Sequence, residues 1–326
     1  MLARNAPMQL RFRPARLEDI DECVDCLADG FAYEPRDLGK LVHIWREIIE
    51  TGCGNFSIIE DENLPRGQRL VRFSVRVFVT DDYLHRMSTD LPPTVGRTLV
   101  DRRADVPSPM LSLAEMRRAN THGGLNMIPL SYGLPERHLI PKSRAEVATR
   151  TVDWIRYSSG GYRLRTLIVE VYDEFDYRWA EGLGCVLLTD YHSVDSPDFI
   201  VNSEYRPRLY GIRAGVDPTP PGTMAYVLFN AEQPRFGLTA SQQEMLLHAM
   251  QGATDEELAD ELRLAPVTVK KRWSAIYDRV SRTAPDVLSI VPEQSERGAK
   301  GLQRRRRLIE HLRGHMEELR PYEPRK

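Results

Sequence analysis

The sequence of 326 residues has few of the features that mark secreted and membrane proteins. It contains only four cysteines, without the spacing of a disulfide framework, so we expect a reducing, cytoplasmic setting. No run of about 18 apolar residues is present. The first residues, MLARNAPMQLRFRP, lack the apolar segment of a signal peptide. We therefore expect no contact with a membrane.

The chain also lacks a large excess of positive or negative charge. The formal net charge is −2, which gives no overall attraction to nucleic acid, so any affinity for DNA must come from a local surface. Hydrophobic residues make up 41% of the chain, enough for a sizeable core, and the length fits two domains.

Motifs of common catalytic and metal sites are absent as well. We find no Gly-rich phosphate loop, nucleophile elbow or catalytic triad pattern. Cys23 and Cys26 form a CxxC within an amphipathic helical pattern, but without a second ligand pair they indicate core packing. His311 and His315 have the spacing of a zinc pair, yet no third ligand accompanies them. We expect no metal, no cofactor and no enzymatic activity.

The most strongly patterned stretch is residues 238–280, which predicts three short helices. Capping boxes at Thr239–Gln242 and Thr254–Glu257 open the first two helices, and Pro266 suits the first turn of the third. The third helix carries an apolar stripe of Val269, Trp273, Ile276 and Val280. If the first two helices pack against this stripe and leave the other side of the third helix exposed, the arrangement is a helix-turn-helix.

This stretch resembles the C-terminal DNA-binding domain of LuxR-type transcription regulators. The matching residues are Leu238-Thr239, Glu244, Met245-Leu246, Gly252, Glu257-Leu258-Ala259, Leu262, Thr268-Val269-Lys270 and Ile276-Tyr277. Gln242, Ala265, Arg272 and Ala275 depart from the family pattern. The resemblance implies double-stranded DNA as partner, with bases contacted by Val267, Thr268, Lys271 and Ser274 and phosphates by Lys270 and Arg272. A solvated helix face is the alternative for these charges.

The N-terminal part alternates strands and helices. We expect strands at 9–13, 56–59, 70–80, 125–131, 164–172 and 185–189, with helices near 17–31 and 143–157 and a short helix that ends at 179–181. In the strand at 70–80, Val71, Phe73, Val75, Val77 and Val79 share one side, and Arg72, Ser74 and Arg76 share the other. Residues 88–123 read as irregular with at most one short helix, near 111–119. Residues 201–221 read as loop, and 223–230 as a last strand.

This order resembles the GNAT acetyltransferase fold, as do the stretches 11–20 and 179–185. That family holds coenzyme A pyrophosphate on a Gly-rich loop at a helix N-terminus. The matching stretch, 132–143, offers only Gly133 and contains no such motif, which argues against acetyl transfer. Glu170 and Tyr172 end a strand where acetyltransferases sometimes keep acid–base groups, and a structural role is an equal alternative.

Together these patterns predict an α/β, GNAT-like domain with a mixed sheet at 1–230, a linker at 231–237, an all-α helix-turn-helix at 238–283 and a basic helical extension at 284–326. The leading interpretation is a DNA-binding transcription regulator whose N-terminal domain receives a small-molecule or protein effector, with a homodimer as one arrangement. The alternatives are a GNAT-family N-acetyltransferase with an appended helix-turn-helix, and a protein-interaction module with a degenerate one. The block Arg304–Arg307 fits phosphate contacts or a solvated, partner-binding face equally well.

Overall fold

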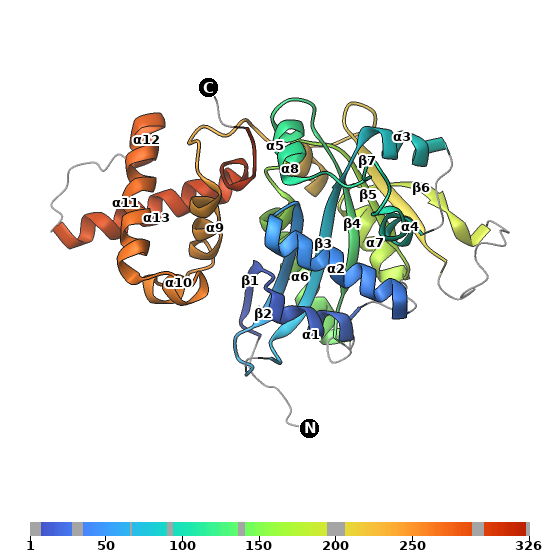
Figure 1. Ribbon diagram of the computed structural model, residues 1–326, viewed down its shortest axis with the longest axis horizontal. Helices are drawn as coiled ribbons and strands as arrows, with labels where there is room; N and C mark the ends of the chain where they lie inside the picture. Colours follow the sequence, from blue (N-terminus) through green and yellow to red (C-terminus); the bar gives the residue numbers. More distant parts are fainter. Residues whose placement is uncertain are drawn as a thin grey trace.

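The computed structural model describes residues 8–27, 35–65, 67–89, 94–135, 141–193, 206–288 and 297–323. An α/β part and a helical part lie side by side, with the helical part next to the β1 edge of the sheet (Figure 1). No helix among these residues has the length and apolar character needed to cross a bilayer.

The α/β part is built on a 7-stranded sheet of order β1-β2-β3-β4-β5-β7-β6. The strands are β1 (Leu10–Pro14), β2 (Gly54–Asp61), β3 (Leu70–Val79), β4 (Leu125–Gly133), β5 (Leu164–Val171), β6 (Val186–Asp190) and β7 (Arg208–Arg213). β4 and β5 are parallel, and all other neighbours are antiparallel. This mixed sheet confirms the expected GNAT-like architecture of the N-terminal part.

Helices cover both faces of the sheet. The elements are η1 (Leu17–Asp19), α1 (Ile20–Asp25), α2 (Pro35–Thr51), α3 (Asp81–Thr89), α4 (Val95–Arg102), α5 (Leu113–Thr121), α6 (Pro141–Ser159), α7 (Glu174–Gly182) and α8 (Met224–Phe229). On one face, Trp45 of α2 packs edge-on against Phe56 and Phe73. On the other, Trp154 of α6 lies against β3 side chains. Both faces of β3 are therefore buried.

Three local predictions are wrong. Residues 88–123 contain α4 in addition to α5, and Val95 and Leu99 of α4 are buried in the core. Residues 224–229 form helix α8 rather than a strand, because the Thr223 side chain accepts the Tyr226 N–H and caps a helix. The last strand is instead β7, within the stretch expected to be a loop. Helix α6 also starts earlier, at Pro141, than the predicted capping box at 143–146.

The helical part follows the predicted pattern closely. It contains α9 (Ala240–Ala249), α10 (Asp255–Glu261), α11 (Pro266–Thr283), α12 (Pro285–Leu288), α13 (Arg297–Gly314) and η6 (Met316–Leu319). The capping boxes at Thr239 and Thr254 both form. The apolar stripe of α11 is buried: Val269, Trp273, Ile276 and Val280. The local helix signals were thus sufficient to place these elements.

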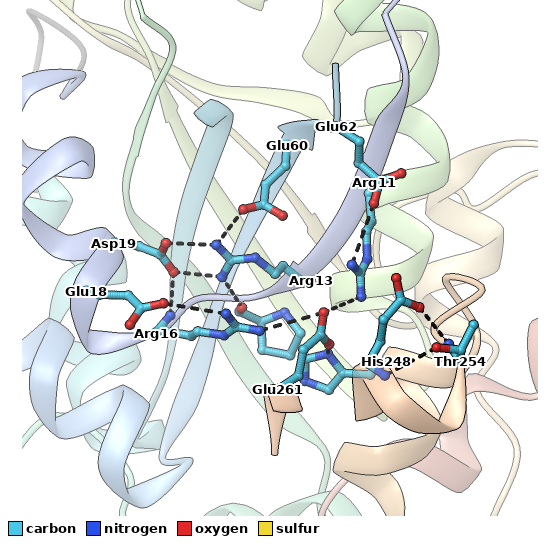
Figure 2. A network of polar contacts seen from close by, with 12 residues as sticks. Arg11, Arg13, Arg16, Glu18, Asp19, Glu60, Glu62, His248, Thr254 and Glu261 are labelled. Atoms are coloured by element: carbon cyan, nitrogen blue, oxygen red, sulfur yellow. Dashed lines mark hydrogen bonds and ion pairs between the residues drawn. The ribbon is translucent and has the colours of Figure 1, made fainter. Parts of the chain in front are cut away.

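A polar network joins the two parts across the β1 edge (Figure 2). Arg11 of β1 lies 2.6 Å from a carboxylate oxygen of Glu261, at the end of α10. The same carboxylate lies 2.6 Å from His248 Nδ1 of α9. Burial alone would raise the pKa of Glu261, but the hydrogen bond and charge of His248, followed by Arg11, lower it to about 2. Glu261 is therefore ionised and ties the helical part to the sheet.

The segment 316–323, which we call the C-terminal clamp, makes a second connection. Its Arg320 is buried, donates from Nε to Gly160 O at 2.7 Å, and also donates to the Tyr157 carbonyl. The Glu318 carboxylate accepts the backbone N–H groups of Arg235 and Phe236 at 2.7 and 2.9 Å. The clamp thus binds both the turn after α6 and the stretch that connects the two parts.

Candidate functional site

The clearest opening in the sheet lies where β4 and β5 separate. These parallel strands pair only from Leu125 and Leu164 to Met127 and Leu167, and within the described residues no pair joins them farther on. On its other side β4 carries an irregularity, since Val75 and Arg76 of β3 face Ser131 and Pro129 and leave Leu130 without an opposite residue. The carboxyl ends of neighbouring parallel strands are where α/β sheets place ligands.

A cavity of about 70 Å³ lies at this divergence. Its walls come from β3, β4, β5 and the helices α6, α7 and α8, and most of them are apolar. The polar and aromatic lining includes Arg72 and Arg76 of β3, Tyr132 of β4, Trp154 of α6 and Trp179 of α7. The cavity has room for a small chemical group rather than for a whole cofactor.

Glu170 of β5 holds a buried carboxyl group on the opposite face of the sheet. Its neighbours Val169 and Val171 line the cavity, so Glu170 points toward α4, where the Gly96 N–H donates to Oε2 at 3.0 Å. The Tyr172 hydroxyl donates to the other oxygen. Burial raises the pKa of Glu170 to about 7, and the Tyr172 and backbone hydrogen bonds limit that rise. A carboxyl of this kind can exchange protons near neutral pH.

Tyr132 of β4 spans the gap between the separated strands. Its hydroxyl donates to the Glu170 carbonyl oxygen at 3.3 Å and lies 3.4 Å from Asp176 Oδ2 at the start of α7. Burial, and then the charge of Asp176, raise the pKa of this hydroxyl well above its ordinary value. The group therefore stays protonated and can serve as a hydrogen-bond or proton donor.

Gly133, the single glycine of the expected cofactor loop, has a structural role. A Cβ atom there would lie 1.9 Å from the Cys26 carbonyl oxygen, so glycine is required for the end of α1 to approach β4. The CxxC prediction agrees, because Cys23 is buried in the core and Cys26 packs against it. Residues 136–140 of that loop lie outside the described residues.

The six predicted DNA contacts all lie on α11, far from this cavity in the sequence and in the other part of the fold (Figure 1). Val267, Lys270, Lys271 and Ser274 are exposed, and Thr268 and Arg272 are half-buried. Arg272 donates to the Ser241 carbonyl oxygen at 3.1 Å, so it also joins α11 to α9. Their contact with DNA stays a prediction.

His311 and His315, which have the spacing of a zinc pair in the sequence, lie next to each other in the structure. The His311 and His315 rings stack with centroids 4.1 Å apart. The side chains that could share a metal with His315 are Glu232 and Glu317, with one ligand atom from each of the three residues within 4.8 Å. His315 Nδ1 lies 2.8 Å from Glu317 Oε1, an ordinary ion-pair geometry.

Comparison with known proteins gives matches among solved structures only. No family model matches the chain, and no curated protein does. The C-terminal condensation domain of Ebony in complex with beta-alanyl-dopamine is similar over 63% of this chain and 99% of that chain, at 13% identity and a TM-score of 0.40. NAA60 of Arabidopsis thaliana in complex with a bisubstrate analogue is similar over 63% and 98%, at 13% identity and a TM-score of 0.37. Spermidine N-acetyltransferase of Vibrio cholerae is similar over 63% and 94%, at 12% identity and a TM-score of 0.34.

These findings correct two expectations. The leading interpretation of the chain as a DNA-binding transcription regulator and the expectation that it is not an enzyme are both contradicted, because the matched structures, each similar over about 63% of this chain, include a spermidine N-acetyltransferase. The LuxR-type resemblance of residues 238–280 finds no support in them. At these identities and TM-scores the likeness says nothing of substrate or mechanism, which must be argued from the site itself.

Proposed function

We propose that the protein is a GNAT-like N-acyltransferase that moves an acyl group from a thioester to an amine at the β4–β5 divergence. The observation that carries the proposal is the opening between these strands, with the Glu170 carboxyl on one face and the Tyr132 hydroxyl across the gap. The pKa of Glu170, raised by burial to about 7, suits a general base, and the Tyr132 hydroxyl, whose pKa is raised by burial, stays protonated as a hydrogen-bond donor.

The donor fits the edge of β4. Beyond Met127 this edge is not paired with β5 in the described residues, so its backbone amides can bind an extended amide-bearing chain as a further strand would. The pantetheine arm of coenzyme A is such a chain, and when bound it would supply an activated thioester. The Gly-rich phosphate loop is missing from the sequence, so the arm rather than the pyrophosphate would provide most of the recognition.

The chain's own groups would divide the proton transfers. Glu170 takes a proton from the attacking ammonium, which leaves a neutral amine free to attack the thioester carbonyl carbon. The new C–N bond forms and the C–S bond breaks. The Tyr132 hydroxyl supplies a proton to the departing sulfur and regains one from the nitrogen as the amide forms, so the net products are the amide, the free thiol and one proton on Glu170. A general base or acid of this type contributes about 10²–10⁴ in rate.

The test is release of free thiol from acetyl coenzyme A by the full chain in the presence of a panel of primary amines. Activity that falls about 10²-fold or more in Glu170→Gln and Tyr132→Phe would support these roles. Glu174→Gln, at an exposed position of α7, is the matched control and should keep full activity. Absence of thiol release with every amine, together with no calorimetric binding of the thioester, would overturn the proposal.

A further inference from the structure

Two arginines of β3, Arg72 and Arg76, line the cavity from the polar side of this strand. Arg76 is only 5% exposed, and Arg72 is half-buried. Because residues at alternate positions of a strand share a face, Arg72, Ser74 and Arg76 all line the same wall. The wall around them is formed mostly by apolar side chains of β4, β5, α6, α7 and α8, with Tyr132, Ser159 and Asp176 as further polar groups.

Within the described residues neither arginine makes an ion pair. Arg76 donates only long hydrogen bonds from Nη1, to Ser57 Oγ at 3.3 Å and Asn55 Oδ1 at 3.5 Å. The buried Arg72 Nε has no acceptor among the described residues. Asp176 is the one carboxylate among the described residues that line the cavity, and it accepts from the Tyr132 hydroxyl at 3.4 Å. Burial, and then the charge of Arg72, lower the pKa of Arg76 to about 9.

Aromatic rings account for part of this arrangement. The Arg72 guanidinium lies 5.7–6.0 Å from the ring centroids of Tyr132, Trp154 and Trp179, and that of Arg76 lies 5.0 Å from Trp154. Such contacts position a guanidinium, but they leave its N–H donors without acceptors. Buried cations normally have both a counter-charge and hydrogen bonds. Among the described residues, the cavity lining therefore carries two guanidinium groups, with N–H donors that lack acceptors, against the single carboxylate of Asp176.

We infer that the cavity binds the carboxylate of a small substrate through Arg72 and Arg76. A carboxylate has two oxygens that match the planar fork of a guanidinium, and it is small enough for a cavity of about 70 Å³. The inference rests on the proposed function, since it assigns the substrate class of the same site. The carboxylate belongs either to a dicarboxylic acyl group on the donor or to an amino acid as acceptor.

Binding of simple carboxylates tests this directly. Calorimetry on the full chain, in a buffer free of phosphate and carboxylate, should detect acetate, succinate or glutarate, with affinity at least about tenfold above that for the corresponding amide. Arg76→Met and Arg72→Met should each weaken that binding by about 10- to 100-fold. Arg165→Met is the matched control, because Arg165 is a strand arginine with a 45% exposed side chain and its own partner, Asp81.

Thermal melting shows whether Arg76 serves to bind a ligand or to stabilise the fold. Without ligand, Arg76→Met should melt no lower than the wild type, because it removes a buried charge that has no acid partner. If none of the three carboxylates binds better than its amide, or if both variants bind like the wild type, the inference is wrong.

Thiol release then distinguishes the two sources of the carboxylate. Preference for succinyl over acetyl coenzyme A, lost in Arg76→Met, assigns it to the donor. Preference for an amino acid over the matching decarboxylated amine, lost in the same variant, assigns it to the acceptor. Acetyl transfer without carboxylate binding would refute the inference alone, whereas carboxylate binding without any thiol release would refute the proposed function alone.

Discussion

Replacement of Glu170 by glutamine should stabilise the protein at alkaline pH while it removes the proposed base. The folded-state pKa is about 7 and the ordinary value is 4.5, a difference that corresponds to roughly 3 kcal/mol. The folded protein holds this proton more tightly than the unfolded chain does. The stabilisation is therefore complete below about pH 4.5 and is lost as the pH rises through about 7.

Glutamine imitates the protonated carboxyl, because its carbonyl oxygen can still accept the Gly96 N–H. The free energy of unfolding of Glu170→Gln and of the wild type, measured by urea denaturation, should be similar near pH 5. By pH 8 the variant should be more stable by roughly 2–3 kcal/mol. Other titrating groups affect both proteins equally and cancel in the difference.

Two results would refute this reasoning. If the difference in unfolding free energy stays constant between pH 5 and pH 8, Glu170 is already ionised in the folded protein at neutral pH. If the variant is more stable at pH 8 but transfers acyl groups at the wild-type rate, the carboxyl is structural. The exposed Glu174→Gln change should alter neither quantity and serves as the control.

Four further variants test the packing around the site and in the helical part. Gly133→Ala should unfold the protein or cost more than about 3 kcal/mol in urea denaturation, because the new Cβ would overlap the Cys26 carbonyl oxygen, and an unchanged midpoint would refute the packing of α1 on β4. Trp273→Ala should cost about 3–5 kcal/mol, whereas changing Lys270, Lys271 and Arg272 together to Ala should cost under about 1 kcal/mol by the same measurement. Arg320→Met should cost about 1–3 kcal/mol and speed proteolysis near residues 230–237, because it leaves buried carbonyls of the α6 turn without a donor.

Local sequence signals predicted most of the fold, and the errors have identifiable causes. β7 was missed because it is short and contains Gly211, a residue depleted in strands; here a Cβ would lie 2.7 Å from the Leu167 carbonyl oxygen. α8 was taken for a strand because its residues, MAYVLF, are rich in side chains that favour strands. For α8 the Thr223 cap outweighed the strand propensity of these residues.

The sequence predicted the site only in part, because some of its features arise only when the strands and helices assemble. Glu170 and Tyr172 stand at the end of the clearest strand, so their acid–base potential could be seen from the sequence. Alternation in β3 correctly grouped Arg72 with Arg76, but such a pattern cannot show that α6 covers that face. Tyr132 gave no signal, since its importance depends on how far β4 and β5 diverge, a property of the assembled sheet.

The C-terminal clamp has a consequence for how this protein folds as it is made. Residues 157–160 emerge from the ribosome long before Arg320. In the folded protein the Arg320 guanidinium donates hydrogen bonds to the carbonyl oxygens of Tyr157 and Gly160. The α/β part therefore leaves a polar turn uncovered throughout synthesis of the helical part, although domains generally fold in the order of their translation. The turn after α6 is thus completed from the C-terminal side, and interruption of synthesis before residue 320 would leave the Tyr157 and Gly160 carbonyl groups without their donor.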